Sequence, residues 1–196
     1  MEQDYEHDIF ISYRRKQPVI DWMKYHFHPL LEERLPECLS YPPKIYIDSN
    51  IETGADWPAS LRQALKRSRC LVAIWSAEYF RSPWCLAEWH TMMERERLVG
   101  LRSDETPSGL IYPVKFSDGE HFPEIAKNTQ YKNLEKWNSK YESFKQTVHI
   151  IELEREMQNV CDEIAKTLKR CPSWQDWPVI TPNETQPLDF PVPRMR

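Results

Sequence analysis

The chain has 196 residues, of which 40% are hydrophobic and 12% aromatic, and its formal net charge is −4. A chain of this length and composition can bury a core without disulfides or metals, so it is globular rather than disordered. The acidic balance argues against general binding to nucleic acids or to anionic membranes, because both need a basic face.

The first part of the chain contains two predicted strands on either side of a long helix. Ile9–Tyr13 and Ile45–Ile47 are short apolar runs that do not alternate cleanly with polar residues, which favours strands buried on both faces of a sheet. Val19–Leu39 carries apolar residues on one side at helical spacing. Within this helix we expect Pro29 to produce a kink and Leu35-Pro36 to end the regular part early.

The middle of the chain repeats this rhythm. A polar loop over 49–57 precedes a short helix predicted over Pro58–Ser68, with proline at its first position. Cys70–Trp75 is a third predicted strand of the buried type. Ser82-Pro83 combines an N-cap residue with a first-turn proline, and predicts a helix that runs to about Leu98.

The last part of the chain completes the alternation. Leu110–Val114 is a fourth buried strand, and Tyr131–Trp137 is a weaker fifth strand at a sheet edge. Apolar residues from Phe144 to Leu168 follow helical spacing. Residues 171–196 hold six prolines and no glycine, which predicts an extended tail after a domain over residues 1–170. We expect the aromatic residues of this tail to pack on its own domain, because exposed aromatics are unfavourable.

Strands and helices that alternate in this way predict an α/β fold with a doubly wound parallel sheet and helices on both faces. The ligand site of such a sheet lies beyond the carboxyl ends of the strands, where strand order reverses. The chain has only four glycines, which form neither the G-x-G-x-x-G turn of a dinucleotide-binding Rossmann domain nor a P-loop. It also lacks the G-x-S-x-G elbow of α/β-hydrolases and the acidic residues of a receiver domain.

The residues that follow the predicted strands can bind a dinucleotide without a glycine loop. Arg14 or Arg15 can pair with a diphosphate, and aromatic rings can stack on flat bases. Glu88, on the helix after the third strand, should project near the same crevice. The candidate binding residues are Tyr13, Arg14, Asp48, Trp57, Ser76 and Trp84.

Four pieces of the sequence resemble the Toll/interleukin-1 receptor (TIR) domain. They are FISYRR (10–15), YIDSN…GADW (46–57), ALKRSRCLVAIWSAEYFRSPWCLAEW (64–89) and IYPVKF (111–116). The S-x-W-C-x-x-E element, Ser82 to Glu88, is the most specific, and it is closer to enzymatic plant, bacterial and axon-degeneration members than to receptor adaptors. The resemblance covers residues 5–169 and implies a five-stranded parallel sheet in flavodoxin-like order. One departure is the loop sequence 51–54, which lacks the proline common before that glycine.

The resemblance implies an enzyme that cleaves the nicotinamide–ribose bond of NAD⁺, with NAD⁺ as substrate and neither cofactor nor metal. Glu88 inherits the role of the catalytic glutamate, Arg14 a place in the pocket, and Trp57 a place in the mobile loop after the second strand. Nicotinamide leaves as a neutral molecule and needs no general acid, unlike the leaving groups of ordinary glycosides. One carboxylate that stabilises positive charge on the ribose can therefore suffice. The sequence leaves open whether the product is ADP-ribose or a cyclic isomer.

Two other functions stay open beside this NADase. One is a TIR module without catalysis that acts as a signalling adaptor through TIR–TIR contacts. The other is a nucleoside-processing enzyme of similar architecture, such as a deoxyribosyltransferase. The resemblance further implies activation by self-association, a role in immunity or antiphage defence, and a separate sensor or effector protein as partner.

The cysteines and the first residues indicate where the protein works. Five widely spaced cysteines form no CxxC or Cys/His cluster, which predicts reduced, mostly buried thiols and no metal site. The opening MEQDYEHD is acidic and polar, unlike a signal peptide, and no apolar run is long enough to span a bilayer. We therefore expect a cytoplasmic protein.

Overall fold

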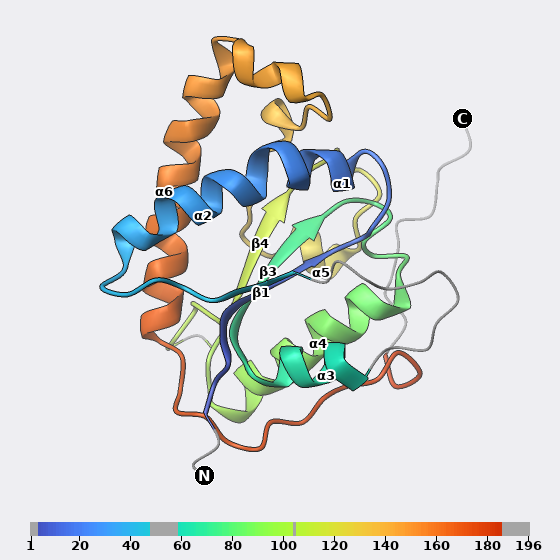
Figure 1. Ribbon diagram of the computed structural model, residues 1–196. Helices are drawn as coiled ribbons and strands as arrows, with labels where there is room; N and C mark the ends of the chain where they lie inside the picture. Colours follow the sequence, from blue (N-terminus) through green and yellow to red (C-terminus); the bar gives the residue numbers. More distant parts are fainter. Residues whose placement is uncertain (1–3, 48–58, 104, 186–196) are drawn as a thin grey trace, which may run out of the picture.

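The computed structural model describes residues 4–47, 59–103 and 105–185 (Figure 1). Two of the predicted binding residues, Asp48 and Trp57, lie outside these ranges, as do the rest of the 49–57 loop and Pro58.

Five parallel strands form one sheet in the order β2-β1-β3-β4-β5, the flavodoxin-like arrangement. The strands are β1 (His7–Tyr13), β2 (Ile45–Ile47), β3 (Ser68–Trp75), β4 (Ile111–Lys115) and β5 (Lys132–Asn133). The predicted fold class is therefore confirmed, together with a strand in each of the five predicted places. The edge strand β5 is shorter than predicted, because the chain turns into the 3-10 helix η2 (Glu135–Trp137).

One strand is less buried than the sequence predicts. The residues of β2 are half-buried, whereas those of β3 are almost all buried. The prediction that Ile45–Ile47 is covered on both faces is wrong, because β2 lies at the edge of the sheet beside β1.

Helices cover both faces of the sheet (Figure 1). One layer contains α1 (Val19–Trp22), the π-helical η1 (Met23–Phe27), α2 (His28–Cys38) and α6 (His149–Lys169), with the 3-10 helix η3 (Glu142–Gln146) before α6. The other contains α3 (Ala59–Lys66), α4 (Pro83–Leu98) and the short α5 (Glu124–Lys127). Successive residues of β3 alternate between the two cores, since Val72 faces the first layer and Ala73 the second.

The helices differ from the prediction at three points. Pro36 lies inside α2, which continues to Cys38, so the predicted early end is wrong. Pro36 is on the exposed side of the helix, where water can satisfy the carbonyl that loses its partner, while buried Leu31 and Leu35 hold α2 on the sheet. The last helix begins at His149 rather than near Phe144, and α5 was not predicted because one helical turn carries no readable period.

Two further observations concern Pro29 and the lengths of the helices, and the kink expected at Pro29 stays a prediction. Pro29 occupies the first turn of α2, directly after the π-helical turn of η1, where the winding of the long helix changes. None of the helices within the described ranges is both long and apolar enough to cross a bilayer.

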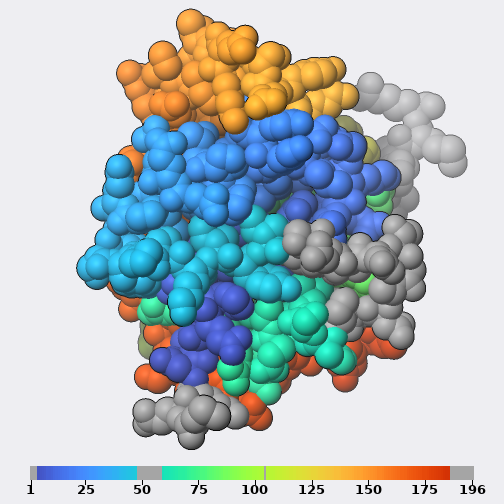
Figure 2. Space-filling model, viewed as in Figure 1, coloured from blue at the N-terminus to red at the C-terminus, as the bar shows by residue number. Residues whose placement is uncertain are grey.

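Residues 171–185 contain no helix or strand and lie along α3 and α4 (Figures 1 and 2). Trp177 is 1% exposed, and its indole N–H donates to the hydroxyl of Tyr5 over 3.0 Å. Further along, the backbone N–H of Ile180 donates to Thr91 Oγ1 over 2.9 Å. The prediction that the tail aromatics pack on their own domain is confirmed for Trp177, while the division at residue 170 stays a prediction.

Candidate active site

The carboxyl end of β1 brings a hydroxyl to the centre of the sheet edge. Ser12 is the last but one residue of β1 and pairs in register with Ala73 of β3. Its side chain is 1% exposed. Because Ser12 belongs to the ladder between β1 and β3, its backbone position is set by that ladder and not by a loop.

The turn between β3 and α4 supplies the second group. The backbone N–H of Tyr79 donates to both the carbonyl and the hydroxyl of Ser76, at 3.0 and 3.2 Å. The ring of Tyr79 packs against Phe80 with centroids 5.3 Å apart and is fully buried. Its hydroxyl oxygen lies 3.1 Å from Ser12 Oγ.

The start of α4 places the third group. Ser82 caps the helix by accepting a hydrogen bond from the backbone N–H of Cys85 at 3.4 Å, and Pro83 is the first helical residue, as predicted. In the second turn of α4, Glu88 is only 6% exposed. The hydroxyl of Ser12 donates to Glu88 Oε2 over 2.5 Å. The carboxylate therefore faces the sheet and not bulk solvent.

Ser12 and Glu88 meet at the point where the strand order reverses. In this sheet β1 lies between β2 and β3, so the connections after β1 and β3 run to opposite sides. The crevice beyond the carboxyl ends of these two strands is the place where open α/β sheets bind ligands.

The charges beside Glu88 act on Cys85, which is 4% exposed. Burial raises the pKa of the Cys85 thiol far above its ordinary range, the negative charge of Glu88 raises it further, and the guanidinium of Arg14 opposes these effects. Cys85 is therefore a protonated, buried thiol. It acts as a small apolar core residue and not as a nucleophile, which would need a thiolate. Because the charges of both Glu88 and Arg14 act on this one thiol, the predicted arginine and the carboxylate lie in the same region of the fold.

An ion pair joins the two loops that border this crevice. Lys16, after β1, contacts Glu78, after β3, with Nζ and Oε2 3.2 Å apart. Arg81 also contacts Glu78, at 3.2 Å. All three side chains are substantially exposed, so the pairs contribute little to stability but place positive charge at the edge of the site.

The structure places the remaining predicted residues at or near this edge. Tyr13 is half-buried at the end of β1, and Arg14 is exposed immediately after it. Trp84 is half-buried in the first turn of α4 and packs against the second core. Ser76 is buried, and its hydroxyl holds the turn that positions Tyr79.

Sequence reasoning did not select Ser12 and Tyr79 as site residues. Ser12 lies at the end of a predicted strand and Tyr79 follows one. However, Ser12 and Glu88 are 76 residues apart in the sequence, and Ser12 and Tyr79 are 67 residues apart. The available signal was that the ends of the first and third strands become neighbours once the strand order is known.

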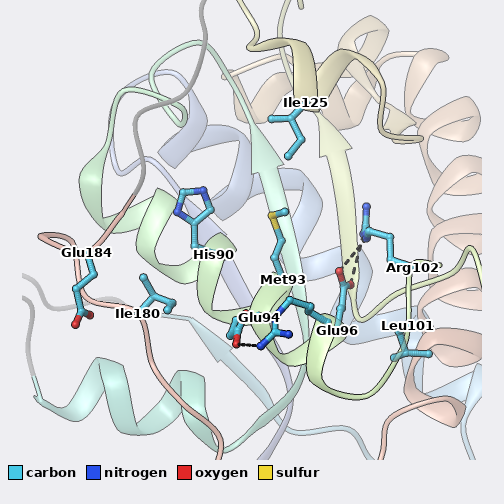
Figure 3. A pocket seen from close by; sticks show the side chains of 10 residues that line it. His90, Met93, Glu94, Glu96, Leu101, Arg102, Ile125, Ile180 and Glu184 are labelled. Atoms are coloured by element: carbon cyan, nitrogen blue, oxygen red, sulfur yellow. Dashed lines mark hydrogen bonds and ion pairs between the residues drawn. The ribbon is translucent and has the colours of Figure 1, made fainter.

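A separate hollow of about 520 Å³ lies on the outer side of α4 (Figure 3). Its apolar lining comes from Met93, Leu101, Ile125 and Ile180. Its charged groups are largely paired with each other, since Glu94 binds Arg97 and Glu96 binds Arg102. Glu96 also accepts the backbone N–H groups of Leu110 and Ile111, which makes it a structural carboxylate. Within the described ranges, no group of three His, Cys, Asp or Glu residues is arranged to hold a metal ion.

The fold and the site together define a class of protein: a flavodoxin-like α/β domain with a buried carboxylate at the switch point of its sheet. Residues 9–148 match the family model of the TIR domain. The chain belongs to the TIR-domain family.

The chain is also similar to individual TIR proteins. It is 26% identical over 105 residues to the probable disease resistance protein RPP1 of Arabidopsis thaliana, a match that covers 50% of this chain and only 8% of that protein. The TIR domains of the Roq1 resistosome are 18% identical, with 80% of this chain and 84% of that chain covered and a TM-score of 0.42; that resistosome is described as activated and as directly recognising the pathogen effector XopQ. The TIR domain of the Toll-related receptor TRR-2 from Hydra magnipapillata is 17% identical, with 78% and 99% covered and a TM-score of 0.42.

Proposed function

We propose that this TIR domain cleaves the bond between nicotinamide and ribose in NAD⁺, with Glu88 as the catalytic carboxylate. The observation that supports the proposal is the buried Glu88 carboxylate beside Ser12 at the switch point of the sheet. NAD⁺ is the substrate, and the proposed reaction uses neither a cofactor nor a metal.

The chemistry needs one well-placed negative charge. As the bond breaks, the pyridinium becomes neutral nicotinamide and positive charge develops on the ribose. A carboxylate held away from bulk water stabilises that charge more strongly than one in solvent, because the local dielectric constant is lower. Arg14, exposed at the end of β1, can pair with the diphosphate, and the half-buried Tyr13 and Trp84 are the aromatic residues proposed to contact the substrate.

The first prediction concerns Glu88 itself. Glu88→Gln keeps the size of the side chain and removes the charge, so nicotinamide release should fall roughly 100-fold or more. The measurement is chromatography of products after incubation of purified protein with NAD⁺. Glu94→Gln is the matched control, because Glu94 lies on the same helix and pairs with Arg97 away from the site; its activity should equal that of the wild type. Undiminished nicotinamide release by Glu88→Gln would falsify the assignment.

The same assay separates the competing functions. Nicotinamide together with ADP-ribose or a cyclic isomer supports the proposal and identifies the attacking group. No turnover at any protein concentration, including under crowding, supports a non-catalytic adaptor. Turnover of nucleosides but not of NAD⁺ supports a nucleoside-processing enzyme.

We further propose that the enzyme acts in cytoplasmic defence, that self-association through TIR–TIR contacts switches it on, and that a separate sensor or effector protein is its partner. The name of the relative RPP1, a probable disease resistance protein, supports the defence role. Five free cysteines, three of them buried, support a reducing compartment. The exposed apolar residues at the start of α6, described below, support self-association.

A further inference from the structure

We propose that Ser12 and Tyr79 form a hydroxyl relay that positions the carboxylate of Glu88, a role that rests on the proposed function of that glutamate. The relay joins three elements: the end of β1, the turn after β3, and α4. Its distances are 3.1 Å from the Tyr79 hydroxyl to Ser12 Oγ and 2.5 Å from Ser12 Oγ to Glu88 Oε2.

The direction of each hydrogen bond in the relay follows from which group has a proton to donate. An ionised carboxylate only accepts hydrogen bonds, and a serine hydroxyl has a single proton to donate. That proton goes to Glu88, where the contact is shorter and charge-assisted. Ser12 therefore accepts from Tyr79. Burial raises the pKa of Tyr79 well above its ordinary range, and the negative charge of Glu88 raises it further, so the phenol keeps its proton as a donor.

All members of the relay are shielded from water and held by the fold. Ser12 is 1% exposed and Tyr79 is fully buried. The strand ladder fixes Ser12, and the ring contact with Phe80 fixes Tyr79. The carboxylate is thus anchored to the sheet as well as to its own helix. Groups held in this way need no reorganisation when charge develops on the substrate.

The ionisable groups near Glu88 determine which titrations can appear in a pH–rate profile. Within the described ranges, the ionisable groups coupled to Glu88 include Tyr79 from the turn after β3 and the Cys85 thiol from its own helix, and Arg14 from the end of β1 acts on the same thiol. The thiol and the phenol stay protonated in the working range because burial raises the pKa of both. The thiol and the phenol therefore do not contribute to the acid limb of a pH–rate profile.

The experiment compares kcat, KM and the pH profile of nicotinamide release for Ser12→Ala, Tyr79→Phe and the double variant. Ser12→Ala should lower kcat about 10- to 100-fold, with KM changed less than about three-fold. It should also move the acid limb up by about one pH unit, because a carboxylate without its donor is protonated more easily. Tyr79→Phe should act in the same direction but more weakly.

The double variant tests the order of the relay. Because the Tyr79 hydroxyl acts on Glu88 through Ser12, Tyr79→Phe should have no further effect once Ser12 is alanine. Two matched controls exist at other places in the fold. Ser68→Ala removes a buried serine hydroxyl that bonds the carbonyl of Ala64, and Tyr112→Phe removes a buried phenol that bonds Glu163 at 2.5 Å. Both should leave kcat and the pH profile unchanged.

Either of two results overturns the relay: a wild-type kcat and acid limb in Ser12→Ala, or a full effect of Tyr79→Phe in the Ser12→Ala background. If the wild type releases no nicotinamide, the proposed function fails separately. The relay is then read from the ¹³C NMR titration of the glutamate carboxyl groups, with Glu88→Gln used to assign the signal. Ser12→Ala should move the Glu88 midpoint to higher pH, and an unchanged midpoint refutes the positioning role.

Discussion

At the scale of single residues, His26 lies in a position that acid should destabilise. It is fully buried in η1, and its Nε2 lies 3.0 Å from the carbonyl oxygen of Tyr141, to which it donates. Its Nδ1 has no hydrogen-bond partner within the described part of the chain. Burial lowers the pKa of His26 below the ordinary value of 6.5, because a second proton would have to be held without water.

This geometry predicts how stability depends on pH. Because the pKa is lower in the folded state, the unfolded chain binds more protons below about pH 6.5, and the free energy of unfolding falls as pH drops through that range. Burial lowers the pKa of His7 and His90 as well, so they contribute in the same direction. His26→Gln keeps a donor for Tyr141 but cannot take up a proton.

The measurement is urea unfolding of wild type and His26→Gln at pH 7.5 and pH 5.5. The variant should lose less stability on acidification than the wild type. Between pH 7.5 and 8.5 the two proteins should change alike, because the imidazole is neutral in both states. Parallel curves down to pH 5.5 would contradict the role given to His26.

At the scale of elements, the segment 171–185 holds α3 and α4 together. Arg95 of α4 is fully buried and donates to the carbonyl oxygens of Leu65, Lys66 and Ser68, where α3 ends and β3 begins. Trp177 covers this guanidinium, with its ring centroid 5.0 Å from Cζ of Arg95. An aromatic face over a desolvated cation is favourable, so the segment completes the packing that α3 and α4 leave open.

The corresponding prediction is that Trp177→Ala destabilises the domain by about 3–5 kcal/mol, the range for removing a fully buried large side chain. Trp177→Phe should cost less, because it keeps an aromatic face over Arg95 and loses only part of the indole ring together with the N–H donated to Tyr5. Urea unfolding monitored by circular dichroism gives the values. Trp174→Ala is the matched control: it removes a half-buried tryptophan of the same segment and should cost clearly less. Equal losses for the two tryptophans would show that the contact with Arg95 adds nothing.

At the scale of the whole molecule, α6 projects beyond the sheet together with η3, above the layer formed by α1 and α2 (Figures 1 and 2). Large apolar side chains are exposed there: Val148 is 75% exposed, Ile151 52% and Tyr141 64%. Val148 and Ile151 are three residues apart and share one side of the helix start. Exposed apolar groups gathered in this way favour contact with another protein surface, and the partner we propose is a second copy of the chain.

We therefore expect specific activity to rise with protein concentration. The double variant Val148→Asp and Ile151→Asp should flatten that rise and lower the mass measured by light scattering at high concentration. Leu98→Asp, at an exposed apolar residue of α4, is the control and should behave as the wild type. The proposal is wrong if the double variant keeps both the concentration dependence and the mass of the wild type.

The sequence alone determined the features that depend on neighbours along the chain. Four apolar runs located β1 to β4, a weaker segment contained β5, and Ser82-Pro83 located the start of α4, because side-chain periodicity and helix capping are local properties. The S-x-W-C-x-x-E element pointed to the family, which the family model confirms, because a specific motif needs no coordinates. It also selected Glu88, whose catalytic role stays a prediction.

Tertiary structure decided whatever depends on residues far apart in the chain. The order of the strands brought Ser12 and Tyr79 to Glu88, the edge position of β2 left it half-buried, and packing on the sheet carried α2 past Pro36. The burial of Trp177 likewise depends on Arg95, which lies on another element. These outcomes depend on which elements pack against each other. Hydrophobic periodicity of two or 3.6 residues shows which residues share a face of one element, but not which other element packs on that face.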